Sequence, residues 1–357
     1  MTTHDTRADI LNALPCTLGP APNSAEWEAL RNFDPERPAH PVHFGASEAA
    51  AACGLLGYAS KTGSIRGLYE KKRGTVCDDH SEELLQHFEV AHAMEPIILS
   101  FYAKECGNDQ VLTEIPMLFS TDPALWYMSA TPDALRCRNG VLIRSVDSKA
   151  SDHLMQDASG EDDAKYGAAG TDAVPLSILL QAQQQMAITG TSYCDVPVWF
   201  AFRSRPVYHV PRDEQLIKLI TEREKELAER IINADPPEWD YEHAGTAQLL
   251  HDVYGFRKDI AETSLTDDDE ALWWQYRSLK SQIKELETNC RGISNRLLSR
   301  LEGATIGNLP GGQTLKRSEI AESYITEDDV MKLALRVGTP KRRAYVKLSG
   351  PTKRKKV

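Results

Sequence analysis

Two carboxylates and an amine stand close together around a short turn near the middle of the chain. Asp133 precedes the turn Asn139-Gly140, and Asp147 and Lys149 follow it. Asn-Gly between two short apolar runs predicts a β-hairpin, because both loop residues of a type I′ turn need a positive φ. Side chains alternate along a strand, so Asp147 and Lys149 share a face. Acids bind a hard cation through oxygen, and a neighbouring amine can orient or deprotonate water or offset charge. The pattern therefore indicates Mg²⁺-assisted phosphodiester cleavage.

The register of this hairpin decides whether the Asp133 side chain is on the same face as Asp147. An ideal two-residue loop would pair Asp133 with Val146 and turn the Asp133 side chain away from Asp147. We therefore expect a β-bulge in the hairpin, or an Asp133 that lies just outside the ladder. Taken alone, these residues more readily describe a solvent-facing hairpin with ordinary surface charges. The flanking segments decide between the two interpretations.

Two predicted helices precede the hairpin. The first is alanine-rich and covers 48–54, with Ser47 as its N-cap. Its free amides and the Ser47 hydroxyl could hold a phosphate, although for Ser47 alone a simple cap is the better explanation. The second covers 81–106, and we expect Pro96 to kink it or to start a new helix. Glu95 beside this break is a candidate metal ligand, with an ordinary exposed glutamate as the alternative.

A polar, glycine-containing loop over 151–174 is predicted to follow the hairpin at the mouth of the site. A helix should then begin at Pro175 and end at Gly190, since proline favours the first turn and glycine the position after the last. Gln181, Gln184 and Gln185 fall on one face of that helix. Their amides could position reactive groups or simply cap the edge of the core.

Composition and cysteine usage bound the class of protein. A chain of 357 residues with 41% hydrophobic and 26% charged residues can form one large globular domain with an appendage. No apolar run reaches transmembrane length and no secretory signal is visible, so we expect no membrane association and a cytoplasmic location. The seven cysteines are scattered without any Cys-X-X-Cys pair, which argues against a zinc or iron–sulfur site.

The charge is uneven along the chain. The net charge is −11, which would ordinarily argue against a nucleic-acid partner. The last segment, 341–357, is nevertheless basic and contains no acid, and it includes Lys341, Arg342 and Arg343. Such a tail could contact DNA phosphates or act only as a solubilising segment.

The pattern predicts five regions along the chain. They are an irregular lead-in over 1–40, a catalytic domain over 41–240, a helical extension over 241–303, a small hairpin region over 304–340 and the basic tail over 341–357. Within the extension, a helix over 266–302 begins with a capping box of Thr266 and Asp269. Its apolar residues recur every three or four positions, which is coiled-coil spacing: Leu272, Tyr276, Leu279, Ile283, Leu286, Cys290, Ile293 and Leu297. This helix is predicted to be a packing or self-association element.

Five short motifs in order resemble the YqaJ-like viral recombinase family, whose members are relatives of phage lambda exonuclease. The matching segments are Gly45-Ala46-Ser47-Glu48, His92-Ala93-Met94-Glu95-Pro96, Ala130-Thr131-Pro132-Asp133, Asp147-Ser148-Lys149, and the helix from Gln181 to Gly190. The third and fourth form the Pro-Asp…(Asp/Glu)-X-Lys motif of the restriction-endonuclease-like nucleases. Two departures are Asp147, where the family usually has Glu, and Ala134, where it usually has Gly.

The resemblance implies an α/β fold with a restriction-endonuclease-like core, in which helices flank a central mixed β-sheet, plus a C-terminal helical extension. It implies Mg²⁺-dependent 5′→3′ digestion of double-stranded DNA during phage homologous recombination, and Mn²⁺ could take the place of Mg²⁺. The implied site residues are the metal ligands Glu95, Asp133, Asp147 and the backbone carbonyl of Ser148, the water-activating Lys149, the positioning Gln181, and the DNA-binding Ser47 and Thr131.

The resemblance also sets expectations for partners and leaves alternatives open. The expected partners are double-stranded DNA ends, a single-strand annealing protein and further copies of the chain in a ring trimer, in a phage-infected bacterial cytoplasm. An endonuclease or nickase on the same fold is one alternative, because the motif dictates cleavage but not end preference. A non-catalytic DNA-binding recombination protein is another, although the intact acids and lysine disfavour it. Between Lys149 and the glutamine helix, the only possible cations are His153 and Lys165, so no arginine of that segment could clamp a phosphate.

Overall fold

The computed structural model describes residues 7–37, 41–55, 61–78, 82–151, 166–201, 204–255 and 262–317. These residues form two compact units, the first ending at Phe256 and the second beginning at Arg257. Lys341, Arg342 and Arg343 of the basic tail, and 152–165 of the predicted polar loop, lie outside the described residues. No helix in the described ranges is long and apolar enough to span a membrane.

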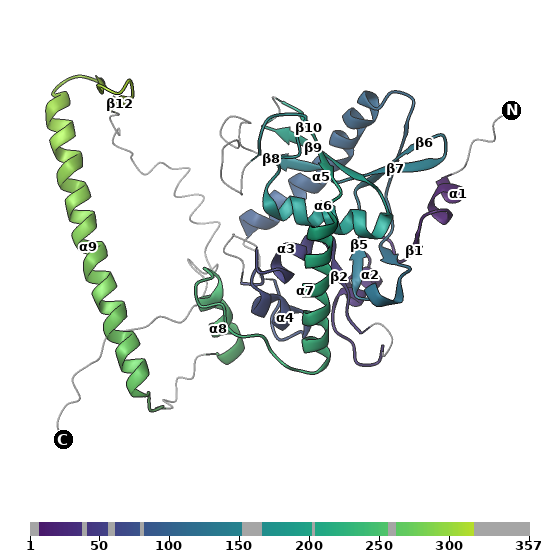
Figure 1. Cartoon of the computed structure of the whole chain (residues 1–357), viewed down its shortest axis with the longest axis horizontal. Helices are drawn as coiled ribbons and strands as arrows, with labels where there is room; N and C mark the ends of the chain where they lie inside the picture. Colours follow the sequence, from purple (N-terminus) through teal and green to yellow (C-terminus); the bar gives the residue numbers. More distant parts are fainter. Residues whose placement is uncertain are drawn as a thin grey trace, which may run out of the picture. The chain divides into compact units, whose positions relative to one another are not determined.

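The first unit combines helices with two β-sheets (Figure 1). Its helices are α1 (Arg7–Asn12), α2 (Ala25–Arg31), α3 (Ala49–Ala52), α4 (Ile65–Lys72), α5 (Glu82–Glu105), α6 (Leu176–Thr189), α7 (Glu214–Ile232) and α8 (Thr246–Tyr254). Its strands are β1 (Cys16–Leu18), β2 (Phe44–Gly45), β3 (Gln110–Thr113), β4 (Leu118–Ser120), β5 (Met128–Ala130), β6 (Ala134–Arg138), β7 (Val141–Val146), β8 (Lys149–Ser151), β9 (Tyr193–Phe200) and β10 (Val207–Pro211). Short 3-10 helices cover Ala46–Glu48 and Pro123–Leu125.

The larger sheet has the strand order β10-β9-β7-β6-β3, and β8 also pairs with β9. The β7–β9 and β8–β9 pairs are parallel, whereas the β10–β9, β6–β7 and β3–β6 pairs are antiparallel. The smaller sheet has the order β1-β4-β5-β2, with β2 and β5 parallel. The predicted α/β fold with a central mixed sheet and flanking helices is thus confirmed.

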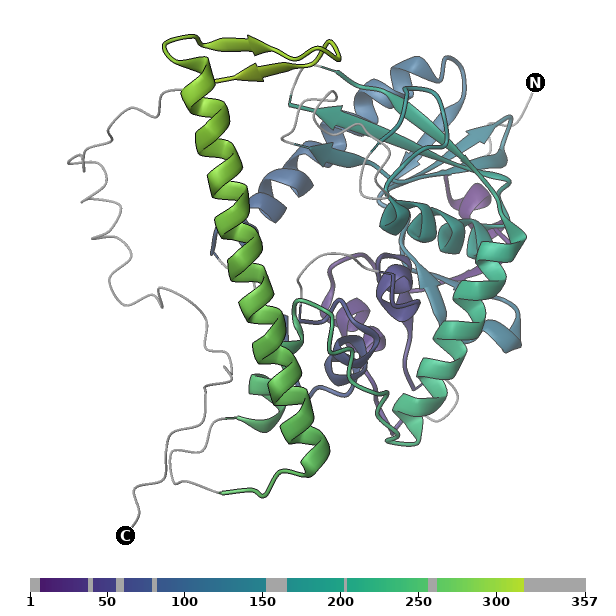
Figure 2. The same cartoon turned by 60° about the vertical axis from the view of Figure 1, so that its left-hand side comes forward.

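Helices α5 and α6 cover opposite faces of the larger sheet. Successive side chains of β9 point to opposite faces. The Cys194 thiol contacts Gln185 of α6, whereas the Asp195 carboxylate accepts a hydrogen bond from Tyr102 of α5. Figure 2 shows the sheet strands with helices on both sides. The sheet is therefore the middle layer between α5 and α6. Side chains at the edge of the sheet lie between these two helices.

Helix α6 begins and ends where the sequence predicted. Pro175 occupies the N-cap position, and Gly190 follows the last turn with a φ of 71°. That left-handed conformation costs glycine little because it lacks a Cβ. The residues between are mostly buried, including Leu180, Met186 and the glutamines at 183–185.

The hairpin of β6 and β7 contains both the predicted turn and the predicted bulge. Asn139 and Gly140 have φ values of 53° and 78°, as a type I′ turn requires. The register shifts between Arg136 and Cys137, so that Ala134 pairs with Val146. Asp133 lies one residue before this ladder and therefore comes opposite Asp147. The bulge places the two acids on one face.

One local prediction was wrong and a second is answered only in part. Of the two outcomes expected at Pro96, a new helix start does not occur, since α5 runs through Pro96 as one helix, and the kink stays a prediction. Ser47 is not an N-cap, since it lies inside the 3-10 helix Ala46–Glu48 and Gly45 occupies the cap position. The Gly45 N–H donates instead to the Glu48 carboxylate at 3.0 Å.

The second unit contains the helix α9 (Asp267–Leu301) and a hairpin of β11 (Ile306–Asn308) with β12 (Thr314–Lys316). The Thr266 hydroxyl accepts from the Asp269 N–H, and the Asp269 carboxylate accepts from the Thr266 N–H. The predicted helix and its capping box are confirmed, as is a hairpin after them.

Candidate functional site

The first acid of the site lies on the link between the two sheets. Residues 131–133 connect β5 of the smaller sheet to β6 of the larger one. The Asp133 N–H donates to the Val146 carbonyl at 3.1 Å. One Asp133 carboxylate oxygen accepts from the Ser148 N–H at 2.6 Å and from the Ser148 hydroxyl at 2.9 Å. These bonds hold the Asp133 side chain beside the strand end that carries Asp147.

The second acid, Asp147, is buried among one cation and two amides. Its exposed fraction is 1%, and its Oδ2 lies 2.7 Å from the Lys149 ammonium. Its Oδ1 accepts from the Gln181 amide at 2.7 Å and from the Gln185 amide at 3.1 Å. The Gln181 carbonyl in turn accepts from Lys149 at 3.4 Å. Gln181 therefore contacts both members of the ion pair, and the predicted joint projection of Asp147 and Lys149 is confirmed.

Burial and acid–acid repulsion shift the protonation of Asp133. Removal from water raises the pKa of its carboxyl to about 7, and the Glu95 carboxyl adds to the rise by its charge and a hydrogen bond. The charge of Lys149 and the hydrogen bond from Ser148 oppose the shift. Glu95 and Asp133 are thus a close pair of carboxyl groups, and Asp133 changes its protonation near neutral pH.

Asp147 and Lys149 have pKa values set by burial and by each other. Burial raises the pKa of Asp147, aided by Asp133 and opposed by Lys149. Burial would lower the pKa of Lys149, but the charges of Asp147 and Asp133 overcome it and hold that pKa above its ordinary value. Lys149 is therefore an ammonium group at neutral pH, which donates hydrogen bonds and cannot accept a proton.

A cleft of about 1100 Å³ opens beside this ion pair. Its lining includes predicted residues from four separate segments of the chain: Ser47, Glu95, the pair Thr131 and Asp133, and Gln181. The Ser47 side chain is exposed, as a ligand-binding hydroxyl requires.

The cleft also contains an arginine that the sequence analysis missed. Arg31 of α2 lines the cleft, and its guanidinium lies 4.6 Å from the centre of the Trp27 ring. The Trp27 indole N–H donates to the Thr131 hydroxyl at 3.2 Å. A Cβ at Gly45 would come within 3.2 Å of the same guanidinium, so glycine there admits the Arg31 side chain. The available signal was the spacing of Trp27 and Arg31, which puts them one turn apart on a helix.

Next to the cleft, Glu48 is the centre of a cluster of cations. Its carboxylate lies 3.0 Å from Arg31, 2.7 Å from Lys72 and 3.7 Å from Lys71. Burial alone would raise the pKa of Glu48, but these charges hold it well below its usual value. Lys72 also donates to the carbonyls of Arg31 and His43, at 2.7 and 2.8 Å. The cluster ties α2, α4 and the 3-10 helix together beside Ser47.

The other α6 amide at the site, Gln185, was also not predicted to act there. Gln185 shares Asp147 with Gln181 because the two are one turn apart, a signal present in the sequence. Gln184 instead donates to the carbonyls of Phe44 and Ser129, both at 3.1 Å. It joins α6 to β2 and β5.

The donor set suits a divalent cation of the Mg²⁺ type. In the part of the chain that is described, no three His, Cys, Asp or Glu side chains are gathered into a ready-made metal cluster. Glu95 and Asp133 nevertheless form a partly buried carboxyl pair that shares a hydrogen bond, and the charge of Asp133 raises the pKa of nearby Asp147. Hard cations prefer carboxylate oxygens, so a cation would reduce the repulsion among these acids. Ser148 contacts Asp133 through its N–H and hydroxyl, which leaves the role of its backbone carbonyl as a prediction.

Comparison with known proteins supports the resemblance seen in the sequence. Residues 26–192 match the family model of the YqaJ-like viral recombinase domain. No curated protein sequence matches the chain. Among solved structures, an alkaline exonuclease (LHK-Exo) from Laribacter hongkongensis has 15% identity and a TM-score of 0.38, covering 54% of this chain and 89% of that one. The complex of LHK-Exo with dAMP has 17% identity, a TM-score of 0.39 and the same coverage.

Proposed function

We propose that this chain, whose residues 26–192 belong to the YqaJ-like viral recombinase domain family, is a metal-dependent deoxyribonuclease that digests double-stranded DNA from its 5′ ends. The observation that carries the proposal is that a carboxyl pair and an ion pair lie next to each other at one cleft. Glu95 and Asp133 line the cleft, the Asp147–Lys149 ion pair lies beside Asp133, and Gln181 of the cleft contacts the ion pair. The product would be a single strand suited to homologous recombination.

The acids would bind the metal. Glu95, Asp133 and Asp147, with the backbone carbonyl of Ser148, would hold Mg²⁺, and Mn²⁺ could replace it. A bound divalent ion supplies Lewis-acid stabilisation of the phosphate and lowers the pKa of bound water. The Ser148 N–H and hydroxyl keep the Asp133 carboxylate aimed at this position.

Lys149 and Gln181 would organise the attacking water and the phosphate. As an ammonium, Lys149 offsets negative charge that develops on the phosphate and donates to water. Gln181 fixes the lysine through its carbonyl and Asp147 through its amide. Because Lys149 is protonated, its role would be to stabilise negative charge and to orient water. The sequence resemblance had implied instead that Lys149 activates the water.

The Trp27–Arg31 pair would distinguish a DNA end from internal duplex. Ser47, Thr131 and Arg31 line the same cleft as the acids and offer two hydroxyls and a guanidinium. A terminal 5′-phosphate carries more charge than an internal diester, and a guanidinium binds it through paired N–H donors. Lys341, Arg342 and Arg343 would add phosphate contacts, and a single-strand annealing protein would take up the product.

One assay tests the proposal. Purified protein is incubated with Mg²⁺ and linear duplexes that do or do not carry a 5′-phosphate, and with closed circles. We expect degradation of linear DNA, faster with the phosphate, no cutting of circles, and no activity in EDTA or in the Lys149→Ala variant. Cutting of closed circles would identify an endonuclease instead. Binding without cleavage under any divalent metal would identify a DNA-binding protein.

A further inference from the structure

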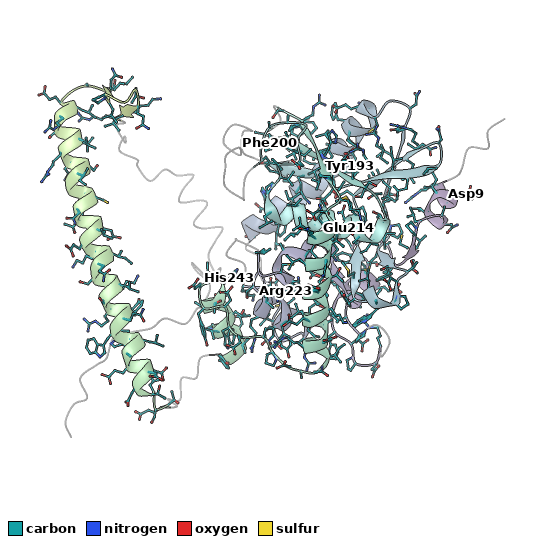
Figure 3. All side chains as sticks on the ribbon, in the orientation of Figure 1. Asp9, Tyr193, Phe200, Glu214, Arg223 and His243 are labelled. Atoms are coloured by element: carbon teal, nitrogen blue, oxygen red, sulfur yellow. The ribbon has the colours of Figure 1, made fainter. Side chains whose placement is uncertain are left out.

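The helix α9 displays an apolar stripe that is exposed among the described residues of its unit, 262–317. None of its residues is buried, and its seam residues are exposed, for example Leu286 at 62%. Figure 3 shows side chains projecting from α9 along its whole length. The stripe consists of Leu272, Tyr276, Leu279, Ile283, Leu286, Cys290, Ile293 and Leu297. Water contact along so long a stripe is unfavourable, which marks it as an interaction surface.

The spacing of the residues in the stripe indicates that another helix binds to it. Its residues alternate at three and four positions, which gives a narrow seam of a and d sites. Tyr276, Ile283, Cys290 and Leu297 occupy the a sites. Such a seam matches a helix with the same repeat, because each side chain enters a hole between four residues of the facing helix. A second copy of α9 supplies that repeat without any further assumption.

The charged residues of α9 favour an antiparallel over a parallel pair of two copies. If the helices run antiparallel with full overlap, a and d sites face each other as Ile283 with Leu286, Tyr276 with Ile293, and Leu279 with Cys290. The end layer then sets Asp269 against Arg300 of the other copy. Among the described residues, neither of these two forms an ion pair within its own chain. The flanking sites in this register set Lys280 against Glu287, and twofold symmetry produces every such pair twice.

A parallel pair would lose these attractions and create repulsions. Equal positions would meet, so Arg300 would face Arg300, and Asp269 would face Asp269. Lys280 would lie beside Gln275 and Glu287 beside Gln282, without an opposite charge for either. Antiparallel pairing also places the acidic first turn of α9, 267–270, near the last turn of the other copy, which contains Arg300, and this complements both helix dipoles.

We infer that α9 is a self-association helix, on which two copies of this chain pair as an antiparallel coiled coil in the register that joins Ile283 to Leu286. This goes beyond the proposed nuclease activity and does not depend on it. The pair is twofold symmetric, so it joins chains in even numbers. A threefold ring of nuclease units, as the family resemblance implied, would need a different contact.

The molar mass of the full chain in solution tests the pairing. We expect an even number of chains per particle by light scattering, and half that number for Leu286→Lys, whose charge would be buried in the seam. Leu298→Lys is the matched control, because Leu298 is exposed on α9 but lies off the stripe. We expect its mass to equal that of the parent. A monomeric parent chain, or equal masses for both variants, would overturn the inference.

Charge exchange tests the register. Lys280→Glu and Glu287→Lys should each weaken association roughly 3- to 30-fold, since each creates two like-charge contacts in the symmetric pair. The double variant restores opposite charges and should recover the parent affinity. Additive losses in the double variant would contradict this register.

Disulfide trapping tests the direction independently. In a Cys77→Ser background, antiparallel pairing keeps the two Cys290 residues apart, and Leu279→Cys adds a thiol opposite Cys290 of the other copy. We expect oxidation to cross-link only the chain with Leu279→Cys, and we expect the link to disappear when Cys290→Ser is added. Cross-linking through Cys290 alone would indicate a parallel pair and overturn the inference.

Discussion

Glu48 and Asp133 lie beside the same cleft in the first unit, and their carboxyl groups are shifted in opposite directions. Glu48 is enclosed by Arg31, Lys71 and Lys72, and its pKa is far below the usual value. Asp133 has another acid, Glu95, as its neighbour, and its pKa is raised to about 7. Burial is the largest single cause acting on both, so burial does not distinguish them. The balance of neighbouring charges does: three cations act on Glu48, whereas at Asp133 the cation Lys149 is opposed by the acid Glu95.

The difference separates a structural acid from a reactive one. The Glu48 carboxylate is already satisfied by fixed cations, so it stabilises the fold and has no free capacity for a metal. The carboxyl pair at Asp133 shares its opposing cation, Lys149, with Asp147, so acid–acid repulsion remains there that a divalent cation would relieve. The four predictions below test this contrast.

The largest expected effect is on catalysis. Asp133→Ala and Lys149→Ala should each reduce cleavage by about a thousandfold or more, the scale of losing a metal ligand or an electrostatic catalyst. Asp133→Ala should change the thermal midpoint little, because it removes a partly exposed acid that burial and Glu95 disfavour in its charged form. Lys149→Ala should lower the midpoint, because it leaves buried Asp147 without its cation. Nuclease rates and thermal melts measure the two quantities. Near-normal cleavage by either variant would remove these residues from the active site.

The next effect is on stability. Glu48→Gln should lower the free energy of unfolding by about 3–5 kcal/mol, because it leaves buried Lys72 without its counter-charge. Chemical denaturation measures the change. Glu224→Gln is the matched control: burial raises the pKa of Glu224 well above its usual value, which favours the uncharged acid, so an uncharged amide should replace it at smaller cost. Equal losses in the two variants would contradict the contrast drawn here.

A smaller effect on rate is expected within α6. Gln181→Ala should slow cleavage by about 10- to 1000-fold, the usual scale for losing one positioning hydrogen bond, with Mg²⁺ affinity nearly unchanged. Gln184→Ala should slow it much less, because Gln184 contacts backbone carbonyls of β2 and β5 rather than Asp147. Single-turnover rates and calorimetric Mg²⁺ titrations separate the two roles. A slower Gln184 variant would reverse the assignment.

The smallest effect concerns pH. With a pKa of about 7, Asp133 is mostly protonated at pH 6 and ionised at pH 8, so protons compete with the metal on the acid side. Apparent Mg²⁺ affinity should therefore fall by about tenfold from pH 8 to pH 6. Asp133→Asn should remove this part of the dependence. Identical affinities at the two pH values in the parent protein would show that Asp133 is not a ligand.

The same shift affects folding of the metal-free protein. An unfolded aspartate ionises near pH 3.9, whereas folded Asp133 does so near 7. Its contribution to stability is thus fully present below about pH 4 and is lost as pH rises through about 7. Mg²⁺ should restore stability on the alkaline side.

The sequence by itself determined the features that depend on neighbours along the chain. The Asn139-Gly140 turn, the limits of α6 at Pro175 and Gly190, and the repeat on α9 follow from φ preferences and helical spacing. The need for a bulge could also be derived, since the alternation of strand side chains left Asp133 on the wrong face without one.

Tertiary structure alone decided which charges surround each acid. Arg31, Lys71 and Lys72 reach Glu48 from two other helices, and Arg31 enters the cleft because Gly45 has no side chain. The division of the α6 glutamines between Asp147 and the smaller sheet is likewise a matter of packing. The continuity of α5 through Pro96 reflects core contacts that outweigh local propensity. Such contacts join residues far apart in sequence, and their electrostatic energy depends on distances of a few ångströms that no local pattern records.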